Sequence, residues 1–306
     1  FAPASIGNLG VGFDVLGLAI AGAGDRVMAR RKETAGVAIA EVRAPDGAHH
    51  ASLSDDPARN TASIAAAALW QEHGDGGGLE MRIHKGVPLQ SGMGSSAASA
   101  VAGVVAANAL LGKPLPVTSL LPYALAGEKF ASNGLHADNV APSLLGGLVQ
   151  CSPALVPGVV RGPLSGDLKS VLLHPDLEVN TAESRGGLAK QVATEAWINQ
   201  QGNLACFIAA CHENDIAMMR RTLRDDIIEP QRQHAVPCFP AVKQAALDAN
   251  AIGSSLSGSG PSIFALCEAS DAEDVETAMA TACRDKGYEC RTWISDIDAP
   301  GASILD

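Results

Sequence analysis

The chain has 306 residues, of which 18% are charged and 47% hydrophobic, and its formal net charge is −11. This length can bury a full core without disulfides or structural metals, and at roughly 150 residues per domain we expect about two domains. The acidic balance and the 4% of aromatic residues argue against a nucleic-acid or an anionic-membrane partner. The seven cysteines include no C-x-x-C pair, which predicts reduced thiols in the cytoplasm and neither a disulfide framework nor a zinc site.

The first part of the chain is apolar and punctuated by glycine over residues 1–24. It contains Asp14 and no basic leader, so we expect neither a signal peptide nor a membrane span, and we expect the natural chain to begin before Phe1. Strand-like patterns follow at 26–31 and 37–42. The opening is therefore predicted to be rich in β-structure.

Helical and strand patterns alternate in the next part of the chain. Asn60 is placed to cap a helix that runs through Glu72, and residues 79–84 alternate apolar with polar as a half-buried strand does. Further helices are predicted over 95–111 and 118–130.

Proline and glycine cluster at 152–167, which we take as the domain boundary. We therefore predict one domain over 1–155 and a second over 156–306. The elements predicted beyond the boundary are a strand at 170–174, helices around 188–201, 203–212, 214–224 and 237–249, a strand, a glycine-rich turn and a strand at 262–267, a helix at 271–286 and a strand at 288–294. This alternation is typical of a two-layer α+β domain.

The most informative segment is a glycine- and serine-rich loop over 88–99 that runs directly into a predicted helix. Unpaired N–H groups and the positive end of the helix dipole favour a phosphate there. Gly92 and Gly94 allow close approach of the backbone, and Ser95 and Ser96 add hydroxyls without bulk. No lysine follows the second glycine, so the segment is not a P-loop.

The loop has two alternative interpretations. Its glycines and Ala97 satisfy the G-x-G-x-x-A pattern of dinucleotide-binding enzymes, but residues 112–118 lack the acidic residue which that pattern needs about 20 positions later. A serine-rich helix cap without a ligand is the other alternative. Two more glycine-rich stretches, at 3–14 and 257–261, weaken it.

The order and spacing of these three stretches resemble the motifs of the GHMP kinase family. Four further segments resemble the family members that phosphorylate homoserine, namely 8–14, 136–147, 181–185 and 229–232. Residues 186–189 depart from the usual continuation of the third segment, which ends in proline. The resemblance covers nearly the whole chain.

The resemblance implies an α+β fold of two domains. The first is an ATP-binding domain that contains a left-handed βαβ unit, and the second is a ferredoxin-like α/β domain. It also implies phosphorylation of the L-homoserine hydroxyl by ATP, a step towards threonine, in a cytoplasmic homodimer. Another kinase of the family and a dinucleotide-dependent oxidoreductase remain as alternatives.

Homoserine is a zwitterion, so its site needs a cation, an anion and groups that orient the reacting hydroxyl. Arg185 and Arg232 suit the carboxylate, and Asp14 suits the ammonium group. The remaining hydrogen bonds are assigned to Asn8, His136 and Asn139. Outside this context, surface arginines and a turn-capping carboxylate would explain the same residues.

The family resemblance also assigns the nucleotide and its metal. The ATP-binding residues are expected to be Asn60, Pro88, Leu89, Gln90, Ser91, Gly92, Met93, Gly94, Ser95, Ser96, Ala97 and Ala98. Ser96 and Glu128 are expected to bind Mg²⁺, because a hydroxyl and a carboxylate suit this hard cation. A metal pair of His136 and Asp138 is less favoured, since no third ligand lies near them in the sequence.

For catalysis we expect Asn139 and Arg185 to orient the hydroxyl, with Asp138 as a second candidate that would take its proton. A loose transition state needs little deprotonation of the nucleophile, so positioning and charge neutralisation can supply most of the rate. A non-catalytic sensor on the same fold could dispense with Ser96 or Glu128. Both are present, which favours an enzyme.

Overall fold

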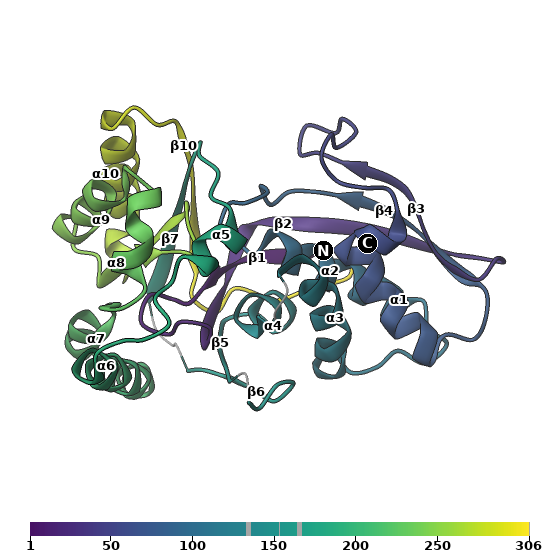
Figure 1. Cartoon of the computed structure of the whole chain (residues 1–306), viewed down its shortest axis with the longest axis horizontal. Helices are drawn as coiled ribbons and strands as arrows, with labels where there is room; N and C mark the ends of the chain where they lie inside the picture. The colour runs from purple at the N-terminus through teal and green to yellow at the C-terminus, as the bar shows by residue number, and fades with distance from the viewer. Residues whose placement is uncertain (133–135, 153, 164–166, 306) are drawn as a thin grey trace.

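The computed structural model describes residues 1–132, 136–152, 154–163 and 167–305 (Figure 1). The strands are β1 (Ala2–Gly7), β2 (Leu16–Lys32), β3 (Gly36–Arg43), β4 (Gly78–His84), β5 (Leu148–Cys151), β6 (Val159–Arg161), β7 (Leu168–Pro175), β8 (Gly253–Leu256), β9 (Ile263–Glu268) and β10 (Cys290–Asp296). The α-helices are α1 (Thr61–His73), α2 (Ser95–Ala109), α3 (Leu121–Ser132), α4 (Ala137–Leu145), α5 (Thr181–Gly186), α6 (Thr194–Glu213), α7 (Ile216–Thr222), α8 (Glu229–Arg232), α9 (Phe239–Asp248) and α10 (Ala272–Asp285). Among these described helices, none has both the length and the apolar character needed to cross a membrane.

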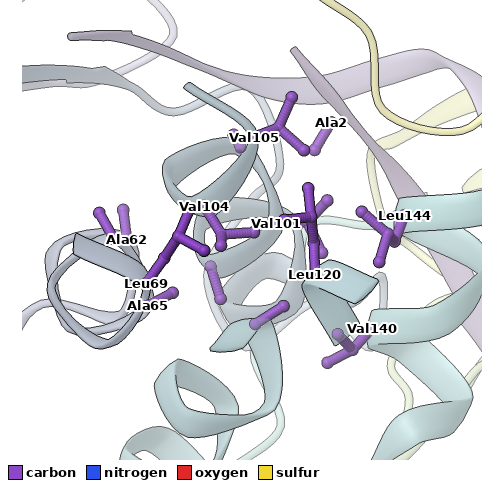
Figure 2. Close-up of a cluster of buried hydrophobic side chains, with 14 of the residues drawn as sticks. Ala2, Ala62, Ala65, Leu69, Val101, Val104, Val105, Leu120, Val140 and Leu144 are labelled. Atoms are coloured by element: carbon purple, nitrogen blue, oxygen red, sulfur yellow. The ribbon is translucent and has the colours of Figure 1, made fainter. Parts of the chain in front are cut away.

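The first sheet has the strand order β3-β4-β2-β5-β6, and β1 pairs with β2. β3 and β4 are parallel and are connected through α1, which makes a βαβ unit. In Figure 2, Val101 and Val104 of α2 lie between Leu69 of α1 and Leu144 of α4. Gly103 permits this close packing, because a Cβ there would collide with the Ala62 carbonyl of α1. The alanine-rich helices can thus pack against each other at short range.

The second sheet is antiparallel and has the order β10-β7-β9-β8. Its elements follow one another as β7, α9, β8, β9, α10 and β10, with α5 to α8 inserted before α9. This β-α-β-β-α-β arrangement is the ferredoxin-like one. The prediction of an α+β chain with a ferredoxin-like second half is therefore confirmed.

The two sheets share one continuous hydrophobic cluster, which includes Ile6 of β1, Phe207 of α6 and Phe264 of β9. The ends of the chain also meet, since the amino group of Phe1 donates a 2.9 Å hydrogen bond to the Ser303 carbonyl (Figure 1). The domain division at residue 155 stays a prediction. Because β6 still pairs with β5, the chain leaves the first sheet between β6 and β7.

Three predicted elements have a different extent in the structure. The strand predicted at 26–31 is the second half of β2, which already begins at Leu16. Gly17 lies inside this strand; a Cβ there would collide with the Asp138 carbonyl, so the glycine permits close packing of β2 against α4. The helices predicted at 188–201 and 203–212 form one helix, α6, which begins only at Thr194; it continues through position 202 because a single exposed glycine costs only about 1 kcal/mol.

Candidate active site

The three glycine-rich stretches meet where the two sheets join. Ser257 Oγ donates a 2.6 Å hydrogen bond to the Gly92 carbonyl, which connects the third stretch to the second. The backbone N–H of Gly258 donates to the Gly7 carbonyl at 3.1 Å, which connects the third stretch to the first. A Cβ at Gly92 would lie 2.7 Å from the Gly260 carbonyl oxygen, so only glycine fits this contact. Segments some 250 positions apart thus form one wall.

A cavity of about 430 Å³ opens beside these loops. The predicted site residues that line it are Asn8, Asp14, Asn60, Leu89, Gln90, Ser91, Gly92, Gly94, Ser95, Ser96, Glu128, His136, Asp138, Asn139, Arg185 and Arg232. Pro88, Met93, Ala97 and Ala98 do not line it. The side chains of the last three are buried in hydrophobic clusters, so any contact of theirs with a nucleotide would have to come from the backbone.

The start of α2 has the geometry of an anion site. Gly94 adopts the left-handed conformation (φ 68°, ψ 38°) and caps the helix without a side chain. The first helical hydrogen bond runs from Ala98 N to Gly94 O at 2.8 Å, so the preceding N–H groups have no acceptor within the helix. A long loop separates α2 from β4, unlike the direct strand-to-turn connection of a dinucleotide motif.

A buried ion pair that the sequence analysis missed supports this loop. The fully buried Asp25 of β2 pairs with Lys85 Nζ and accepts hydrogen bonds from Val87 N at 3.0 Å and Ser99 Oγ at 2.6 Å. Lys85 Nζ also donates to the Ser95 carbonyl at 3.0 Å. The pair connects β2 to both ends of the loop. Sixty positions separate its members, so no local pattern could have indicated it.

Ser96 and Glu128 are brought together as predicted. Ser96 Oγ, in the first turn of α2, donates a 2.7 Å hydrogen bond to Glu128 Oε2 of α3. Glu128 is buried, although both residues line the cavity. Their oxygens form a donor set suited to a hard divalent cation.

Asn60 has a structural role in addition to its place on the cavity wall. Its Oδ1 accepts a 3.1 Å hydrogen bond from Ala62 N and so caps α1. Its contact with ATP stays a prediction.

The cavity wall also holds a charged cluster. Arg185 donates to both oxygens of Asp14, at 2.6 and 2.9 Å, and His136 Nδ1 lies 3.6 Å from the same carboxylate. Burial alone would raise the pKa of Asp14, but hydrogen bonds with His136 and Arg185 outweigh it and hold this pKa below its usual range. The hydrogen bond with Asp14 raises the pKa of His136. Arg185, predicted to bind a substrate carboxylate, is therefore paired with Asp14.

Asp14, His136 and Asp138 place three ligand-type atoms within 4.8 Å of one another. Asp14, which is distant in the sequence, thus supplies in space the third ligand that the sequence did not place near His136 and Asp138. We nevertheless assign no metal to these three residues, because the Arg185 guanidinium already neutralises Asp14 in a bidentate ion pair.

Arg232 differs from Arg185 because it forms no ion pair with any described carboxylate. Only 4% of its surface is exposed, and one of its terminal nitrogens donates to the Gly258 carbonyl at 3.0 Å, while its Nε has no partner in the described structure. Burial and the charge of Arg185 lower its pKa. Phe13, which the sequence analysis missed, lies 5.2 Å from both guanidinium groups. A buried cation without a counter-ion favours an anionic ligand.

Asp138 and Asn139 project from the first turn of α4, a helix that the sequence analysis did not predict. Asp138 is 2% exposed, and its Oδ1 has no hydrogen-bond partner among the described residues. Burial, and then the charge of Asp14, raise the pKa of Asp138 to about 6. Asn139 Nδ2 donates to Asp138 Oδ2 over a long 3.4 Å.

Replacing Asp138 by asparagine is expected to stabilise the protein at neutral pH. The folded-state pKa of Asp138 is about 6, above the ordinary value of 3.8, so the folded protein binds the proton more tightly than the unfolded chain. Ionising Asp138 therefore lowers stability as the pH rises from about 4 to 6, by roughly 2–3 kcal/mol. Asp138→Asn removes this loss above pH 6, and its advantage over the wild type should shrink towards pH 4.

Urea unfolding of both proteins between pH 4.5 and 8 measures this effect. Asp285→Asn, at an exposed position at the end of α10, is the control and should show no such pH dependence. An advantage for Asp138→Asn that grows as the pH falls would contradict the raised pKa.

Comparison with known proteins agrees with this geometry. Residues 60–147 match the model of the GHMP kinases N terminal domain, and residues 207–285 match that of the GHMP kinases C terminal domain. The chain belongs to the GHMP kinase family, whose members use ATP as a co-substrate.

The individual relatives that are similar in sequence and structure include several homoserine kinases. A homoserine kinase of Xylella fastidiosa (strain M12) is 42% identical over 100% of this chain and 93% of that protein, and one of Chloroherpeton thalassium is 37% identical over 100% and 98%. The crystal structure of a homoserine kinase from Cytophaga hutchinsonii superposes with a TM-score of 0.93 at 40% identity, covering 98% of this chain and 95% of that one.

Proposed function

We propose that this chain is an ATP-dependent kinase that phosphorylates the terminal hydroxyl of L-homoserine and forms O-phospho-L-homoserine. The relatives of 37–42% identity named above, which are homoserine kinases, support this substrate. The observation that carries the proposal is the buried guanidinium of Arg232, which has no carboxylate partner among the described residues and lies in the cavity that also contains the start of α2. The loop before α2 would bind the phosphates of the nucleotide. The buried Arg232 guanidinium would bind a second anion, such as the carboxylate of an amino acid.

The charged cluster suits a zwitterion. With Arg232 on the carboxylate, the ammonium group would bind near Asp14, whose carboxylate retains lone pairs beyond its two bonds to Arg185. Asn8 Nδ2 and Arg232 both donate to the Gly258 carbonyl. This shared acceptor fixes the position of Arg232 relative to Asn8.

The reacting hydroxyl would lie between the charged cluster and α2, beside Asn139. Gly94 supports this placement, because a Cβ there would lie 3.0 Å from Asn139 Oδ1. Asn139 orients the hydroxyl towards the transferred phosphoryl group. Asp138 is the candidate acceptor for its proton, because its buried Oδ1 has no hydrogen-bond partner among the described residues and its pKa is about 6. In a loose transition state this positioning matters more than early proton removal.

Ser96 and Glu128 are the proposed holders of Mg²⁺, because their oxygens already lie 2.7 Å apart at the start of α2. When bound there, the ion would neutralise charge on the phosphates of ATP.

Ser96→Ala and Glu128→Gln are each expected to raise the magnesium concentration needed for half-maximal rate and to lower turnover at least about tenfold, because each variant removes one oxygen ligand. Magnesium titrations of the steady-state rate at saturating ATP measure this. Glu273→Gln, at an exposed position on α10, is the control. An unchanged magnesium dependence in both site variants would end the assignment.

Homoserine is expected to give the highest rate in an ATP-consumption assay that offers homoserine, mevalonate, galactose, shikimate and isopentenyl phosphate separately. Two arginines and a carboxylate around the cavity have no evident use for a neutral sugar. Phosphorylation of galactose with homoserine inert would overturn the proposed function.

The proposed enzyme works in the cytoplasm, without a nucleic-acid or membrane partner, and as a homodimer. The absence of disulfides among the seven cysteines supports the first of these points. The homodimer rests on the family resemblance, and sedimentation analysis tests it.

A further inference from the structure

Ser5 occupies a junction that the proposed mechanism leaves unexplained. It lies in β1 and is completely buried. Its hydroxyl donates a 3.0 Å hydrogen bond to Asn139 Oδ1, and its backbone N–H donates a 3.0 Å hydrogen bond to the Met93 carbonyl. One residue therefore contacts both the phosphate loop and the amide assigned to the reacting hydroxyl.

Close packing holds the Asn139 amide at this position. A Cβ at Gly94 would collide with Ser5 Oγ, and a Cβ at Gly7 would lie 2.7 Å from Asn139 Nδ2 and 3.1 Å from its Oδ1. The amide plane is enclosed by two glycines and the serine. This packing fixes the plane of the amide but not which way its oxygen and its NH₂ group point.

The neighbouring groups decide this orientation together. A side-chain amide has an acceptor end and a donor end. The Asp138 carboxylate accepts from Nδ2 at 3.4 Å, while the Ser5 hydroxyl donates to Oδ1 at 3.0 Å. Because the first contact is long, the shorter bond from Ser5 contributes more to holding the amide in place.

We propose that Ser5 is a positioning residue for phosphoryl transfer. It holds the Asn139 amide with its NH₂ group available to the substrate hydroxyl, and through Met93 it keeps that amide in register with the phosphate loop. This inference rests on the proposed function, in which Asn139 orients the hydroxyl. Without Ser5 the amide oxygen loses its donor and the amide gains freedom to rotate, so the nucleophile is aimed less well.

The test compares Ser5→Ala with Ser143→Ala. Ser143 is an equally buried serine on α4 whose hydroxyl donates to the Pro3 carbonyl of β1 at 2.7 Å, so its loss removes a similar bond away from the cavity. Ser5→Ala is expected to lower kcat about tenfold while the KM values for homoserine and ATP stay within about twofold. Ser143→Ala should change kcat by less than twofold, although both variants lower the unfolding temperature.

A double-mutant cycle with Asn139→Ala shows whether Ser5 acts through the amide. Ser5→Ala should cause no further loss of kcat in the Asn139→Ala background. If Ser5→Ala does not fold, Ser5→Cys replaces it, because a thiol has similar size and is a weak donor; a lowered kcat at unchanged KM is again expected.

Two results would overturn the role of Ser5: a kcat equal to that of Ser143→Ala, or a full tenfold loss that persists without Asn139. Failure of the proposed function is recognised separately, because the wild-type protein would then not phosphorylate homoserine at all.

Discussion

Gly94→Val is expected to lower ATP affinity more than about a hundredfold while the protein stays folded. Gly94 has a φ of +68°, which a β-branched residue adopts only at a cost. Ser5 and Asn139 also occupy the position next to Gly94 that a Cβ would need. A valine there would therefore push the loop away from both residues. The N–H groups at the start of α2 would then no longer converge on one phosphate.

Titration with a fluorescent ATP analogue, together with thermal unfolding, measures this effect. Gly47→Val is the matched control, because Gly47 has a similar φ of +84° but nothing within 4 Å of its would-be Cβ. The control variant carries the same backbone strain and should keep full nucleotide affinity. Wild-type affinity in a folded Gly94→Val protein would refute the phosphate role of this loop.

Arg232→Leu and Asn139→Leu are expected to separate substrate binding from chemistry. A carboxylate clamp acts equally in the ground and transition states, so Arg232→Leu should raise the KM for homoserine about ten- to a hundredfold with little change in kcat. Asn139 acts at the reacting atom. Misplacing that atom by about 1 Å can cost on the order of a hundredfold in rate, so Asn139→Leu should mainly lower kcat.

Saturation curves for homoserine at saturating MgATP measure both effects. Arg220→Leu is the control, because Arg220 also donates to a backbone carbonyl, that of Ala251, but does not line the cavity. A homoserine analogue without the carboxylate adds a second comparison. The wild type should discriminate against this analogue and Arg232→Leu should not; equal discrimination would show that Arg232 is not the carboxylate partner.

The glycine-rich loop that runs into α2 could be predicted from the sequence because its pattern is local. Two glycines, two serines and the helix that follows lie within a dozen residues, and a helix start offers N–H groups wherever it is placed. The Ser96 and Glu128 contact was also expected, although only through the family resemblance. In contrast, α4 was missed because Pro142 lies inside it and a proline normally argues against a helix.

The sequence by itself thus predicted the α+β class and an anion site at the loop that ends at residue 94, since composition and short-range pattern carry that information, while the polar residues suited to a zwitterion were predicted through the family resemblance. Only the tertiary structure decided how these residues pair. It placed Arg185 on Asp14 and left Arg232 without a carboxylate partner among the described residues, it buried Asp25 with Lys85 beneath the loop, and it brought Ser5 to Asn139 across 134 positions. Such contacts join separate strands, loops and helices, and no periodicity along the chain records them, because they depend on how β1, α2 and α4 pack together.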